Sequence, residues 1–166
     1  MFKENDFIFY GCAGICKLDA ICEQPFEGAR TGVSYYVLHT LNEPRQIIYN
    51  PTDNDRVLMR HIMTPSEAEE YLRVLSSLSP LEGESARELR EGYLTAVKSG
   101  LPSEWGRILR TYVTRRRLSE AGLARVTDAE QSFFDQARKL LSEELALVLS
   151  ISLSEAEARI TQALHR

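Results

Sequence analysis

Three cysteines stand near the start of the chain, at Cys12, Cys16 and Cys22. Cysteine thiolates can hold zinc, which needs four ligands and usually takes two of them from a short Cys-x-x-Cys turn. Here three and five residues separate successive cysteines, and none of the chain's three histidines is adjacent. An odd number of cysteines in one strand-like stretch also does not suit a disulfide framework. We therefore expect reduced thiols that pack as small apolar side chains, with no metal and no cofactor.

Catalytic chemistry would require nucleophiles, bases or phosphate-binding loops at characteristic spacings. The sequence has no glycine-rich phosphate loop, no Gly-x-Ser-x-Gly turn and no His-Glu-x-x-His helix. Glu143 and Glu144 are adjacent carboxylates at the edge of a helical apolar stripe, where pairing with cations is the expected role. His39, His61 and His165 are isolated, and a lone histidine is more often structural than catalytic. We expect that the protein is not an enzyme.

Phosphate binding is another chemistry that the residues suggest, and it depends on arginines. The net charge of the chain is −4, which argues against a simple nucleic-acid coat. The charge is uneven, however. Residues 102–126 carry six arginines and two glutamates, for +4, whereas residues 64–92 carry seven acidic residues and three arginines, for −4. We call residues 102–126 the basic island, and any contact with DNA phosphates is expected to come from it.

The first 63 residues have the pattern of a small β domain. Short runs rich in aromatic and β-branched residues occur at 7–10, 15–22, 33–39, 47–49 and 56–62. Glycine, proline, asparagine and aspartate gather between them, as is typical of turns. Because five short strands cannot build two stacked sheets, we predict one bent sheet that closes into an SH3-like or Tudor-like barrel.

The pattern becomes helical at Thr64. The sequence Thr-Pro-Ser-Glu that begins there combines a capping box with a proline at the first helical position. Apolar residues then recur at helical spacing from residue 68 to 78, and further helices are predicted at 85–99, 103–120, 127–149 and 153–164. A second capping box, at Thr127 and Glu130, opens the longest of them.

These patterns predict the α+β fold class, with a five-stranded barrel over residues 1–63 and an all-α domain of about five helices over residues 64–166. The only tryptophan, Trp105, is in register with Ile108, Leu109 and Tyr112, so we expect it in the helical core. The chain has 166 residues, of which 43% are hydrophobic and 27% charged, as in ordinary globular proteins. We find neither a signal-peptide pattern nor a long apolar run, and we expect a cytoplasmic monomer without a membrane partner.

Several segments match a known family in order along the chain. In the first domain they are residues 6–10, 14–17, 26–28, 35–38 and 48–51; in the second they are residues 98–100, Arg110, Glu130 and residues 137–147. With these segments the chain resembles the CarD or CdnL-like bacterial transcription regulators. The N-terminal domain of that family is similar to the RNA polymerase-interacting domain of transcription-repair coupling factor.

The resemblance implies two partners. One is the RNA polymerase β subunit, which would pair one of its strands with a barrel-edge strand of this chain. The segment that matches the docking strand is residues 46–50, so the candidate polymerase-binding residues are Ile47 and Tyr49, with Gln24 and Arg45 as neighbours. The alternative is that Ile47 and Ile48 lie in the core and Tyr49 is an ordinary half-exposed strand residue. The other implied partner is promoter DNA just upstream of the melted region.

The chain departs from the family at the DNA-facing residues. The family carries a tryptophan early in its second helix, which wedges into the minor groove, followed closely by an arginine pair. Counting back from residues 98–100 places Ala86 at the tryptophan position, and Glu88 and Leu89 at the arginine pair. Alanine cannot wedge between bases. Arg87 and Arg90 could still reach phosphates, although four nearby glutamates would repel DNA.

The basic island offers a second set of candidate DNA contacts. Residues 115–126 form a link about five residues longer than the family's usual one. The candidate phosphate-binding residues on the island are Arg107, Arg110, Arg115, Arg116 and Arg117. Their alternative role is intramolecular ion pairing with acidic helices. Two functions therefore stay open: a polymerase-bound regulator with weak or altered DNA contact, and a protein-interaction module without productive DNA binding.

Overall fold

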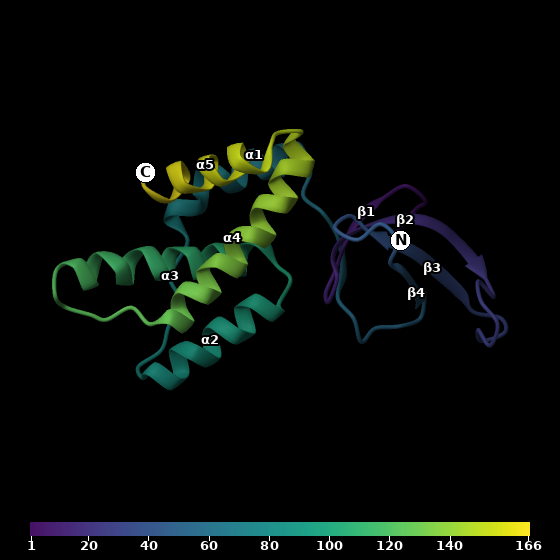
Figure 1. The fold of residues 1–166 in the computed structure, drawn as a ribbon, viewed down its shortest axis with the longest axis horizontal. Helices are drawn as coiled ribbons and strands as arrows, with labels where there is room; N and C mark the ends of the chain where they lie inside the picture. The colour runs from purple at the N-terminus through teal and green to yellow at the C-terminus, as the bar shows by residue number, and fades with distance from the viewer. The chain divides into compact units, whose positions relative to one another are not determined.

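A computed structural model describes residues 1–166 (Figure 1). The chain divides into two compact units, Met1–Ile62 and Met63–Arg166. The first contains all the strands and the second all the helices, which confirms the α+β class. None of the helices combines the length with the apolar content that crossing a membrane requires.

The first unit is a single antiparallel sheet of five strands. They are β1 (Phe7–Tyr10), β2 (Gly14–Glu23), β3 (Ser34–Thr40), β4 (Ile47–Pro51) and β5 (Met59–His61). Their order across the sheet is β4-β3-β2-β1-β5, so β4 and β5 are the two edges of an open sheet. The five predicted strands are confirmed, whereas closure into a barrel stays a prediction.

The sheet is bent around a small apolar core. The pairing of β2 with β3 shifts between Leu18 and Ala20, and such a bulge bends a strand and increases its twist. The concave side is filled by a cluster of fully or almost fully buried residues: Ile8, Tyr10, Cys16, Leu18 and Leu38. Because alternate residues of each strand face this cluster, the residues between them face the opposite side of the sheet.

One buried amide connects the two edges of the sheet. Asn50, on β4, is 1% exposed, and its Oδ1 accepts a hydrogen bond from the Tyr10 hydroxyl of β1 at 3.4 Å. Its Nδ2 lies 3.2 Å from the Met59 sulfur of β5. The Asn54 side chain also donates to Asn50 Oδ1, at 2.7 Å. Polar contacts of Asn50 therefore hold the buried side of β4 in place. The residues of β4 that alternate with the buried ones face outward.

The second unit contains five α-helices. They are α1 (Pro65–Val74), α2 (Ala86–Lys98), α3 (Pro102–Glu120), α4 (Asp128–Leu149) and α5 (Leu153–Leu164), with a short 3-10 helix, η1 (Leu75–Ser77), after α1. The capping boxes predicted at Thr64 and Thr127 are both formed. A third box joins Ser85 to Glu88 at the start of α2. Helices α1, α2 and α4 therefore begin close to their predicted residues because local side-chain bonds fix their first turns.

Helix α4 is the centre of the helical unit. It contacts each of the other four α-helices, and Figure 1 shows α1 and α5 lying side by side at one end of it. Its buried residues include Ala137, Leu141 and Leu145, which lie on one face at helical spacing. Trp105 of α3 is fully buried, and its indole N–H donates to the Val97 carbonyl at 3.4 Å. The predicted core position of this tryptophan is confirmed.

Candidate functional site

Strand β4 presents unpaired backbone groups at one edge of the sheet. The Thr40 N–H donates to the Gln46 carbonyl at 3.4 Å, and the Thr52 N–H donates to the Ser34 carbonyl at 2.9 Å. In an antiparallel ladder, every second residue bonds the neighbouring strand and the residues between them point the other way. Even-numbered residues of this strand therefore bond β3. The N–H and C=O groups of Ile47 and Tyr49 therefore point away from β3, and no backbone hydrogen bond outside the strand ladders uses them.

The side chains of the same two residues are also exposed. Ile47 is 53% and Tyr49 40% exposed, whereas Ile48 is half-buried and Asn50 is buried. This alternation follows from the pleat of the strand, which turns successive side chains to opposite faces of the sheet. The alternative role of Ile47 as a core residue is therefore wrong. The free backbone groups and the exposed apolar side chains belong to the same pair of residues.

An aromatic residue from the loop after β2 extends this surface. The ring of Phe26 lies 5.2 Å from that of Tyr49 and 5.6 Å from that of Tyr35, and Phe26 is 42% exposed. We call Phe26, Ile47 and Tyr49 the edge surface. Prediction of the site from sequence missed Phe26. Its signal was available, because a large aromatic residue between turn residues has no strand to bury it.

The two predicted neighbours of the docking strand are exposed but lie outside this cluster of contacts. Gln24 follows directly after β2 with φ of 49°, and its side-chain amide donates to the Thr31 hydroxyl at 3.3 Å. Arg45 lies in the turn before β4. No hydrogen bond or ion pair in the structure joins either of them to Ile47 or Tyr49. Their role in binding a partner stays a prediction.

The two arginines of α2 lie in different surroundings. Arg87 and Glu91 form an exposed ion pair at 3.1 Å. Arg90 lies one turn further along the helix and lines a cavity together with Ala86. Ala86 is the first residue of α2 and directly follows the Ser85 cap. The position that was predicted from the resemblance to lack the wedging ring is thus at a helix start and carries only a methyl group.

Two arginines in the first half of α3 are engaged with neighbouring groups. Arg107 forms an ion pair with Glu104 at 3.2 Å, and its guanidinium also donates to the carbonyls of Ser79 and Pro80 at 3.2 and 3.4 Å. Arg110 is half-buried and its Nη1 donates to the Leu164 carbonyl at 3.5 Å. These arginines connect α3 to the segment after η1 and to the end of α5.

The three arginines in the second half of α3 have acidic or histidine neighbours. Arg115 pairs with Glu130 of α4, and Arg116 lies 3.6 Å from Glu120. The Arg117 guanidinium approaches His165 Nδ1 at 3.4 Å. Arg116 and Arg117 remain exposed, so they are the arginines of α3 best placed to meet a phosphate. Much of the positive charge of the basic island therefore already interacts with carboxylates or other polar groups of the helical unit.

The cysteines differ in their surroundings. Cys12 is exposed, Cys22 is half-buried and Cys16 is fully buried. Burial raises the pKa of the Cys16 thiol to about 11, with a smaller contribution from Cys12. No three histidine, cysteine or carboxylate side chains gather closely enough to hold a metal ion.

No protein-family model matches the chain, and no curated protein matches it in sequence.

Proposed function

We propose that the protein is a CarD-like transcription regulator that binds the RNA polymerase β subunit by adding a polymerase strand to the edge of β4. The observation that carries the proposal is that Ile47 and Tyr49 combine outward-pointing backbone groups with exposed apolar side chains. In strand addition, main-chain hydrogen bonds supply affinity and alternate side chains supply specificity. The Phe26 ring widens the apolar contact beside Tyr49.

The proposal includes an SH3-like or Tudor-like form of the sheet. The Asn50 side chain supports it, because it reaches Tyr10 of β1 and Met59 of β5 from the opposite edge. In a sheet bent in this way, the outer edge of β4 stays free to pair with a partner strand, while the buried residues of β4 are held in place. Such an edge is a liability for self-association unless it is short, and β4 has only five residues.

Contact with upstream DNA is the weaker part of the proposal. Arg116 and Arg117 are the exposed arginines of α3, and Ala86 cannot supply a wedge. Two phosphate contacts give binding that falls with salt with a logarithmic slope of only about −2. DNA would therefore be held mainly because the polymerase brings it close.

A second candidate function is a protein-interaction module that binds a partner through the same edge without productive DNA contact. The observation that favours it is that most arginines of the basic island already bind other groups of the helical unit. Arg107, Arg110 and Arg115 are all joined to protein groups of their own unit. A guanidinium that is already paired must give up its partner before it can bind a phosphate.

The test of docking is the affinity of the full chain for the lobe of the cognate polymerase β subunit, measured by calorimetry. Tyr49→Glu and Ile47→Lys place charges on the edge surface and should each weaken binding by about tenfold or more. Leu123→Lys is the matched control, since Leu123 is 77% exposed but lies in the helical unit. Equal affinity of Tyr49→Glu and the unaltered chain would reject strand addition.

Binding to an upstream-fork promoter template separates the two candidate functions. The regulator predicts weak, salt-sensitive binding that is lost in the double variant Arg116→Ala and Arg117→Ala. If the protein is an interaction module, we expect it to bind the template no more strongly than an unrelated acidic protein of the same size. A slope steeper than about −5 would instead show that the paired arginines also reach DNA.

A further inference from the structure

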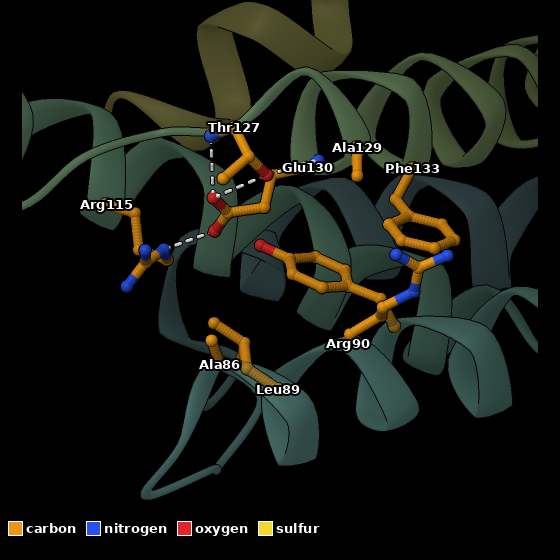
Figure 2. Close-up of a pocket in the computed structure, with 9 residues that line it drawn as sticks. Ala86, Leu89, Arg90, Arg115, Thr127, Ala129, Glu130 and Phe133 are labelled. Carbon is orange, nitrogen blue, oxygen red and sulfur yellow. Dashed lines mark hydrogen bonds and ion pairs between the residues drawn. The ribbon is translucent and has the colours of Figure 1, made fainter.

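The helical unit contains a cavity of about 300 Å³ between α2, the second half of α3 and the start of α4 (Figure 2). Its walls are mainly apolar. They are formed by Ala86, Leu89 and Tyr93 from α2 and by Ala129 and Phe133 from α4. This volume is at the lower end of the range for small-molecule sites, so it suits a compact ligand rather than a peptide or a nucleic acid.

A buried hydroxyl in the cavity lining lacks a well-formed hydrogen bond. Tyr93 is 1% exposed, and its ring stacks on Phe133 with the ring centres 5.1 Å apart and the planes 5° from parallel. The Tyr93 hydroxyl makes no hydrogen bond of ordinary length and angle, although the Glu130 carboxylate is close enough to interact with it. Burial first, and next the charge of Glu130, raise the pKa of Tyr93, so the hydroxyl keeps its proton and can donate it. Buried hydroxyls are normally bonded, so a hydroxyl without a well-formed hydrogen bond in a cavity wall has a donor to offer to a ligand atom.

The charges around the cavity are arranged on two sides. In Figure 2, Arg115 and Glu130 lie on one side and Arg90 and Phe133 on the other. The Glu130 carboxylate is neutralised there, because it pairs with Arg115 and accepts hydrogen bonds from Thr127. No acidic side chain pairs with Arg90. The two arginines and one glutamate of the lining leave one positive charge, and it belongs to Arg90.

We propose that this cavity binds a small aromatic carboxylate. Its ring would occupy the space between the aliphatic residues and the Phe133 ring, and its carboxylate would pair with the Arg90 guanidinium at the cavity mouth. A polar atom on the far side of the ring would accept the unused hydrogen bond of Tyr93. This site is separate from the edge surface and does not rest on polymerase binding.

The experiment uses the full chain and three probes of one shape. They are 4-hydroxybenzoate, which has both polar ends, benzoate, which lacks the hydroxyl, and 4-hydroxybenzyl alcohol, which lacks the charge. Binding is followed by amide chemical shifts during titration. We expect 4-hydroxybenzoate to bind with a dissociation constant on the order of 1 mM or tighter, and each truncated probe to bind about fivefold more weakly.

Two variants identify which protein group meets which end. Tyr93→Phe removes only the hydroxyl, so it should weaken the binding of 4-hydroxybenzoate about fivefold and leave the affinity for benzoate unchanged. Arg90→Gln should weaken both carboxylates and leave the alcohol unchanged. Ala129→Leu fills the cavity without altering either polar group and should weaken all three probes.

The control for folding is the free energy of unfolding. Loss of a hydroxyl without a well-formed hydrogen bond should leave the stability of Tyr93→Phe unchanged or slightly raised. The proposal is overturned if shifts from the probes fall outside the cavity residues or if Tyr93→Phe weakens benzoate and 4-hydroxybenzoate equally. Undiminished binding by Ala129→Leu would overturn it as well.

Discussion

Arg115 of α3 pairs with the same Glu130 carboxylate that closes the capping box of α4. The Thr127 N–H donates to Glu130 Oε2 at 2.9 Å, while Arg115 bonds Oε1. The Glu130 side chain is only 8% exposed and that of Arg115 is 30% exposed. The pair therefore joins the start of α4 to α3 in a partly dry environment, where a lone carboxylate would be costly.

We predict that Arg115→Ala destabilises the helical unit by about 2 kcal/mol, because it leaves a nearly buried carboxylate without its cation. Arg116→Ala is the matched control on the same helix. Its ion pair with Glu120 is 58% and 69% exposed, so the change should stay within about 0.5 kcal/mol. Urea unfolding of both variants at neutral pH tests this. Equal stabilities would show that the buried pair contributes no more than the exposed one.

The outward direction of the Ile47 backbone gives a second prediction. Proline lacks an N–H and is tolerated at sheet edges where that N–H faces away from the ladder. Ile47→Pro should therefore keep the sheet folded and weaken a strand-adding partner, because one donor of the free edge is removed. Ile48→Pro removes a donor that bonds β3 and should unfold the first unit. Circular dichroism and partner affinity distinguish the two; a folded Ile48→Pro variant would mean that the deduced ladder parity is wrong.

The elements could be predicted from sequence because their signals are local. Thr64 with Glu67 and Thr127 with Glu130 fix the first turns of two helices through contacts three residues apart. The exposure of Tyr49 likewise follows from strand alternation, which needs only its immediate neighbours.

Features that depend on distant partners could not be predicted in this way. The residue that opposes Arg115 lies fifteen positions away, and the sequence pattern alone left ion pairing and phosphate binding equally open. The Tyr93 cavity requires three helices to be placed, and helical spacing predicts only that Tyr93 faces inward. Whether β4 and β5 pair depends on the curvature of the whole sheet, which no strand encodes by itself.

The buried thiol gives a third prediction. Because the pKa of Cys16 is raised to about 11 by burial, little thiolate forms at pH 8, and thiolate is the reactive form. Ellman's reagent should therefore modify exposed Cys12 first and Cys16 last in the folded protein. Mass spectrometry of digested samples identifies the order. Early modification of Cys16 would contradict its burial in the sheet core.

The same group sets a pH dependence of stability. The folded state holds the Cys16 proton more tightly than the unfolded state, whose thiol has the ordinary pKa of 9.0. Its contribution to the stability of the first unit is therefore fully present below pH 9 and is lost as the pH rises toward about 11. Cys16→Ala should flatten this part of the profile, at the expense of a small cavity.

Two glycines inside helices provide the last prediction, because their surroundings differ. A Cβ on Gly106 of α3 would overlap the Tyr71 hydroxyl and lie 2.5 Å from Leu78 Cδ1 and 3.0 Å from Leu75 Cδ1. A Cβ on Gly92 of α2 would have its nearest neighbour at 3.9 Å. Gly106 therefore allows α3 to approach α1 and η1 closely, whereas Gly92 fills no such role.

Gly92→Ala should stabilise the helical unit by about 0.5–1 kcal/mol, since alanine loses less backbone entropy than glycine in a helix. Gly106→Ala has the same gain in helix propensity but forces the leucine and tyrosine side chains apart. We expect a net loss of about 1–2 kcal/mol for it, because overpacking a filled core outweighs the gain. Thermal and urea unfolding of the two variants, compared side by side, give the sign of each change. A stabilised Gly106→Ala variant would show that α1 and α3 are free to separate, and the close packing around Gly106 would then not be needed for the fold.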